Sequence, residues 1–162
     1  MPSEPTLPPI TTAGVVASLQ VGVRLHLTAI ENYAAQAAHF GRWGYSKLAA
    51  KYAADAEEER GHLKSLLERL EYYDVQPDCA HDQPMWPRHD FEGVLAANYE
   101  LETATAAAER AGVLACRAVG DERSALVFAS NLEGSEDSIA DIEATQRVLE
   151  QIGLDNYLAN QV

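Results

Sequence analysis

The sequence predicts an all-α protein, a four-helix bundle with one long crossover and a short fifth helix at the C-terminus. Apolar residues recur every three or four positions along most of the 162 residues, which is the period of an amphipathic helix rather than of a strand. Glycines and prolines divide the chain into four segments of similar length, with a long connection between the second and the third. A bundle with one crossover has this pattern.

Each helix has recognisable ends. The first should begin near Thr12 and end near Phe40, where two glycines follow within four residues. Residues 74–90 contain three prolines and several turn formers, so we expect the crossover there. The other helices are expected at about 45–72, 90–119 and 121–152, with two further turns after Gly153.

Residues 12–162 should form one domain, preceded by a flexible proline-rich segment at 1–11. The lead-in has no basic cluster and is followed by no 18-residue apolar run, so we expect neither a signal peptide nor a membrane span. Cys79 and Cys116 lack the spacing of a zinc site or of a disulfide framework. These features favour a reduced, cytoplasmic protein.

Acidic side chains outnumber basic ones by 25 to 12, which gives a formal net charge of -13. Such a charge repels nucleic acid and anionic membranes and raises the local concentration of cations. We therefore expect metal ions as partners, and neither nucleic acid nor a membrane.

Four ionisable residues point to where a metal could bind. Glu59 and His62 lie one turn apart on the same face of the second helix. His26 falls on the apolar stripe of the first helix, and Glu102 on the inward face of the third. Buried charges are unfavourable unless they are paired or bound to metal. Their convergence predicts either a metal site or a metal-free core in which the histidines hydrogen-bond to the glutamates.

Two stretches carry a resemblance to a known family. Residues 27–75 contain an A-I-x-x-Y segment, a W-G turn and the E-x-x-H motif, and residues 148–162 read VLEQIGLDNYLANQV. Both are similar to the matching parts of bacterioferritins, and the similarity runs without gaps from about Leu19 to Val162. The resemblance implies the ferritin-like fold.

The resemblance also implies roles for individual residues. Glu59, His62 and Glu102 stand at ligand positions of the family's di-iron ferroxidase centre, and Tyr33 stands where the family has a tyrosine beside that centre. Three of the six ligand positions are therefore kept.

The other three ligand positions differ from the family. His26 replaces a glutamate on the first helix, and Ser135 and Ser138 replace a glutamate and a histidine on the fourth. Serine hydroxyls are poor ligands for divalent iron, so we do not expect a symmetric di-iron site. His26 and the Glu-x-x-His pair could hold one ion, with Glu102 as a fourth ligand or as the holder of a weak second ion.

The haem position differs as well. In bacterioferritins a methionine directly follows the second-helix glutamate ligand and binds haem iron between two subunits. Arg60 stands at this position, so haem bound in this way is not expected.

Three functions follow from these observations. The resemblance implies a subunit of a 24-subunit shell that oxidises and stores iron, either as a homo-oligomer or together with a complete bacterioferritin subunit. The altered ligands also fit a redox protein that holds one metal ion, or two unequal ones, as iron or another divalent metal. The third possibility is a metal-free structural subunit.

Overall fold

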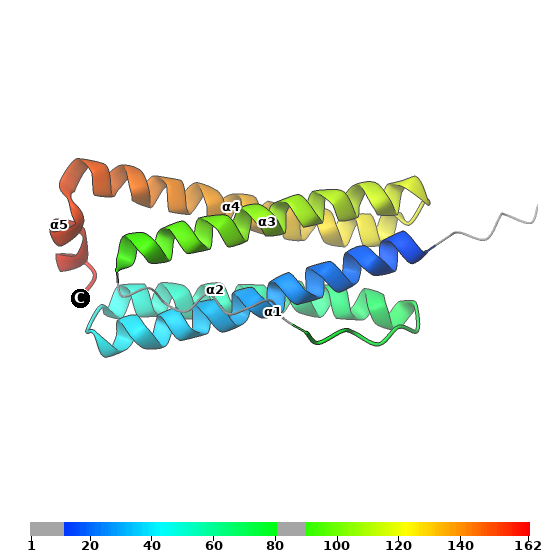
Figure 1. Cartoon of the computed structure of the whole chain (residues 1–162), viewed down its shortest axis with the longest axis horizontal. Helices are drawn as coiled ribbons and strands as arrows, with labels where there is room; N and C mark the ends of the chain where they lie inside the picture. Colours follow the sequence, from blue (N-terminus) through cyan, green and yellow to red (C-terminus); the bar gives the residue numbers. More distant parts are fainter. Residues whose placement is uncertain (1–11, 81–89) are drawn as a thin grey trace, which may run out of the picture.

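The computed structural model describes residues 12–80 and 90–162, and all regular structure in these residues is helical. The predictions for residues 1–11 and for the part of the crossover at 81–89 lie outside them. These residues form four long helices and a short fifth one, arranged as in Figure 1. They are α1 (Ala13–Arg42), α2 (Ser46–Tyr72), α3 (Phe91–Ala118), α4 (Glu122–Ile152) and α5 (Leu154–Ala159).

The four long helices form an antiparallel bundle, as predicted. α1 packs along α2, α3 packs along α4, and α1 also faces α3 (Figure 1). α2 ends at the opposite end of the bundle from the start of α3, so the chain between them has to cross its whole length. The first part of this crossover lies on α1, where the Gln20 side chain donates to the Gln76 carbonyl at 2.9 Å and accepts from the Asp78 amide at 2.7 Å.

Local signals explain the helix ends. The side chains of Asp90 and Asp121 cap α3 and α4 by accepting hydrogen bonds from backbone amides three residues later, at 2.5 and 3.0 Å. Gly153, with φ 79°, ends α4 and separates it from α5. The C-terminal segment then returns to the start of α2, where the Lys47 amide donates to the Gln161 carbonyl at 3.0 Å.

The hydrophobic core consists of two clusters with a polar layer between them. One cluster fills the end of the bundle that holds the start of α1 and includes Leu19, Leu66 and Phe128. The other fills the opposite end and includes Phe40 and Tyr52. Most of the buried ionisable side chains lie between the two clusters, at the middle of the bundle.

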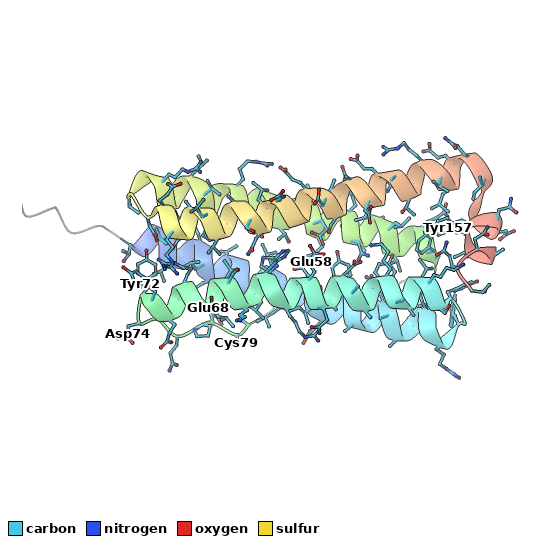
Figure 2. The ribbon with its side chains drawn as sticks, turned by 180° about the vertical axis from the view of Figure 1, so that it is seen from behind. Glu58, Glu68, Tyr72, Asp74, Cys79 and Tyr157 are labelled. Carbon is cyan, nitrogen blue, oxygen red and sulfur yellow. The ribbon has the colours of Figure 1, made fainter. Side chains whose placement is uncertain are left out.

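α1 is long and apolar enough to span a membrane by length and composition. In the bundle its apolar stripe packs inside instead, with Val15, Leu19 and Val23 fully buried. A core helix meets the same criteria as a membrane span. The two cysteines are free thiols, Cys116 buried and Cys79 exposed on the crossover (Figure 2).

Candidate metal centre

A buried hydrogen-bonded network joins all four long helices at the middle of the bundle. The ring of His26 on α1 lies at its centre, with Nδ1 2.5 Å from Oε2 of Glu59 on α2 and Nε2 3.0 Å from Oε1 of Glu109 on α3. Ser135 on α4 donates to the second oxygen of Glu109 at 3.2 Å. All four side chains are buried, so the network is shielded from water.

The two carboxylates determine the charge of the ring. Burial alone would lower the pKa of His26, but the hydrogen bonds to Glu109 and Glu59 outweigh it and raise the pKa to about 9. Both ring nitrogens therefore carry protons at neutral pH and donate to the two carboxylates. Burial would raise the pKa of Glu59, whereas its hydrogen bond with the His26 ring and the nearby His62 ring lower it to about 2. The result is an imidazolium held between two carboxylates.

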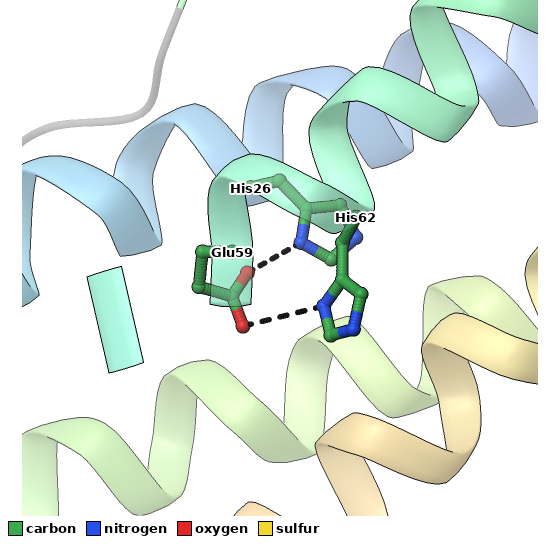
Figure 3. A group of neighbouring side chains, drawn as sticks. All are labelled: His26, Glu59 and His62. Atoms are coloured by element: carbon green, nitrogen blue, oxygen red, sulfur yellow. Dashed lines mark hydrogen bonds and ion pairs between the residues drawn. The ribbon is translucent and has the colours of Figure 1, made fainter. Parts of the chain in front are cut away.

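His26, Glu59 and His62 form a group that could bind a metal ion (Figure 3). One possible ligand atom from each residue lies within 4.8 Å of the other two. Nδ1 of His62 lies 3.6 Å from Oε1 of Glu59 and has no hydrogen-bond partner among the described residues. Two imidazoles and a carboxylate suit divalent iron and its neighbours in the first transition row. The donor set thus fits one ion once His26 gives up a proton.

Glu102 lies outside this three-residue group. Its carboxylate accepts a hydrogen bond from the Tyr33 hydroxyl, and the two side chains are buried together. Burial, reinforced by the negative charge of Glu59, raises the pKa of Glu102 to about 8 despite the bond from Tyr33. Burial beside Glu102 likewise raises the pKa of Tyr33. The two sequence-predicted residues form a pair of their own.

The sequence reasoning missed Glu109, which is fully buried. It stands seven residues after Glu102, two helical turns along the same face of α3. That spacing was the available signal, because a second carboxylate on the same inward stripe should also reach the core. Its carboxylate occupies the space in front of Ser135.

The two serines have different surroundings. Ser135 is buried and bonded to Glu109, whereas Ser138 is half-buried and lines a small cavity. This cavity has a volume of about 20 Å³, enough for about one water molecule. It reaches the Tyr33 ring and the polar side chains of Asp55 and Asn98.

Arg60 points away from the polar layer. Its side chain is 48% exposed, and its guanidinium donates to Glu57 at 2.8 Å and to the Ala56 carbonyl at 3.3 Å. This position therefore presents a cation on the surface.

Comparison with known proteins agrees with the architecture. A family model described as the ferritin-like domain of the ferritins matches residues 16–152. A bacterial ferritin of Synechocystis is 25% identical over 91% of this chain and 96% of its own length, and one of Pseudomonas aeruginosa is 28% identical over 84% and 88%. A bacterioferritin of Brucella melitensis is 26% identical over 88% and 89%. The chain therefore belongs to the ferritin family and is similar to its bacterial members, the bacterioferritins, over most of its length.

Proposed function

We propose that the protein is a subunit of a bacterioferritin-like iron-storage shell whose ferroxidase centre is reduced to a site for a single ion. The observation that carries the proposal is the group of His26, Glu59 and His62, whose ligand atoms converge within 4.8 Å. The relatives named bacterial ferritin and bacterioferritin support iron as the metal.

The remaining side chains argue against a second equal ion. Glu102 is bonded to Tyr33, and Ser135 is bonded to Glu109. Ser138 offers a neutral hydroxyl, which is a poor ligand for divalent iron. A second ion here would have Glu102 as its one carboxylate ligand from the family's set, so it would bind weakly.

The proposal also covers haem, assembly and location, which we infer from the exposed Arg60 and from the similarity to bacterioferritins. Arg60 offers no atom that binds haem iron, so we infer that the subunit holds no methionine-ligated haem. The shell would consist of copies of this chain alone or of a mixture with complete bacterioferritin subunits, and it would lie in the cytoplasm.

A second candidate is a redox protein that uses a different divalent metal at the same site. It is favoured by His26, which stands where the family has a carboxylate, because nitrogen ligands suit copper and nickel as well as iron. In this case the bundle would bind metal without storing a mineral.

Metal content tests the site. The protein should purify with, or take up, close to one ion per chain when it is loaded with Fe(II) without oxygen. Glu59→Ala should abolish this uptake, whereas Glu68→Ala, which removes an exposed carboxylate from the same helix (Figure 2), should leave it unchanged. Equal uptake in the parent and Glu59→Ala would refute the metal site and leave the metal-free structural subunit.

Size and turnover separate the two candidates. Size-exclusion chromatography should give a particle far larger than a dimer if the subunit forms a shell, and a small oligomer would exclude storage. Fe(II) oxidation followed in the near-ultraviolet should be slow in the parent. It should become faster in a variant with His26→Glu, Ser135→Glu, Ser138→His and Glu109→Ala, which restores the family's ligand set and empties the space that Glu109 fills in front of Ser135.

A further inference from the structure

A glycine on α4 lies directly opposite the His62 ring. A Cβ atom at Gly134 would lie 2.6 Å from Cε1 and 2.9 Å from Nε2 of His62, and 3.4 Å from Oε1 of Glu58. Atoms at the first two distances overlap, so any side chain at 134 would enter the volume that the imidazole now fills. Glu58 lies in the middle of α2, on the side that faces α4 (Figure 2).

The backbone gives no reason for this glycine. The described glycines with positive φ are 44, 120 and 153, all at helix ends, whereas Gly134 lies in the interior of α4. Glycine is the weakest helix former apart from proline. The close approach of the His62 ring explains why a glycine stands at position 134.

Little else holds the His62 ring. Its Nδ1 has no hydrogen-bond partner among the described residues, and the Glu59 oxygen is 3.6 Å away. The His26 ring meets it edge-on, at 5.3 Å between centroids. The contact with α4 therefore decides which way the imidazole points.

Asn131 on α4 links the two helices at the same level. Its Nδ2 donates to the His62 carbonyl at 3.5 Å, and its Oδ1 lies 3.4 Å from the hydroxyl of Ser65 on α2, which itself donates to the His62 carbonyl at 2.7 Å. Asn131 lies about one turn before Gly134 on α4. The atoms that a side chain at 134 would meet lie at the far end of the His62 side chain, which can rotate, so we expect the ring to move before the helix does.

We propose that Gly134 is a positioning residue of the metal centre: by having no side chain, it admits the His62 imidazole to the place where its Nδ1 faces Glu59. Gly134 is no ligand and acts through His62 alone. The inference rests on the proposed metal site for its consequence, but the position of the ring can be measured without metal.

The test compares two glycine-to-alanine variants. Gly134→Ala should displace His62, whereas Gly61→Ala is the matched control, since Gly61 lies inside α2 and a Cβ there meets nothing within 4 Å. Both changes improve helix propensity equally. Crystal structures of the metal-free variants should show the His62 ring rotated away from Glu59 in Gly134→Ala and unmoved in Gly61→Ala.

Metal affinity gives the second readout. Co(II) titrations followed by visible absorption should show affinity lowered tenfold or more in Gly134→Ala, with an altered d–d spectrum, and no change in Gly61→Ala. In a His62→Ala background the further change Gly134→Ala should have no effect on Co(II) affinity, because the residue through which it acts is gone.

Three results would overturn the inference. An unmoved ring in Gly134→Ala would do so, as would a loss of Co(II) affinity that persists in the His62→Ala background. A variant that no longer folds would show that His62 cannot yield and that Gly134 serves helix packing. If the parent bound no Co(II), the proposed metal function would fail, while the ring position would still decide the role of Gly134.

Discussion

Replacing Glu102 by glutamine should stabilise the metal-free protein at neutral pH. The Glu102 carboxyl is 1% exposed, and burial together with the Glu59 charge raises its pKa to about 8 from the ordinary value of 4.5. The folded protein therefore holds this group protonated at pH 7, while the unfolded chain ionises it freely. Glutamine has nearly the same shape, is always neutral, and its carbonyl can still accept the hydrogen bond from Tyr33.

The magnitude follows from proton linkage. A carboxyl whose pKa is raised on folding lowers stability progressively as the pH rises from the unfolded value to the folded one. Between 4.5 and pH 7 there are two and a half units, and each is worth about 1.4 kcal/mol, so the expected gain for Glu102→Gln is about 3 kcal/mol. For a chain of this size the melting temperature should rise by about 6 to 12 °C.

Thermal unfolding in the presence of a chelator, at pH 7 and at pH 4.5, checks this expectation. The difference between parent and Glu102→Gln should be large at pH 7 and should nearly vanish at pH 4.5, where Glu102 is protonated in the folded state and half protonated in the unfolded one. A variant that is no more stable than the parent at pH 7, or equally stabilised at both pH values, would refute the reasoning.

Three further changes have expected outcomes. Gly112→Ala should lower stability by about 1–3 kcal/mol in thermal unfolding, because the Cβ of the new alanine would lie 2.7 Å from the ring of the buried Phe128. An unchanged melting temperature would contradict this. The stability advantage of the parent over His26→Gln in denaturant titrations should shrink by about 2 kcal/mol between pH 7 and 10, since the stabilisation by His26 is fully present below 6.5 and disappears as the pH rises through about 9. Glu102 titrates in both proteins, so a difference that stays constant over this range would refute the role of His26. Arg69→Met should lower the free energy of unfolding by about 2–4 kcal/mol in the same assay, because the Arg69 side chain is 6% exposed and donates hydrogen bonds to Ser124 and to Asp121, the N-cap of α4. Arg110 is exposed, so Arg110→Met should change stability by less than about 0.5 kcal/mol. Equal losses in the two variants would count against the argument.

The positions of the helices could be predicted from the sequence because they depend on local features. Apolar spacing and helix-breaking residues gave boundaries within about two residues, and the confirmed crossover followed from the prolines after α2. α1 continues to Arg42, two residues past its predicted end, because Gly41 is tolerated inside a helix whose other residues favour it.

The centre could be predicted in part. Helical period places Glu102 and Glu109 on one face of α3, about 10 Å apart along the axis, but it does not say which of them meets His26. The sliding of one helix along another decides this, and it depends on the packing of side chains from all four helices. His26, Glu59 and His62 converge as expected. The position of Glu102 beside Tyr33 needed the structure.

The imidazolium between Glu59 and Glu109 has a consequence for the order of folding and of metal binding at the proposed site. Small metal-dependent domains often remain unfolded until their ion arrives. Here the polar layer carries its own counter-charge, so the chain should fold before any ion binds. A metal ion that binds at the proposed site would displace a proton from a bundle that is already folded. A chelator should therefore remove the ion without unfolding the protein.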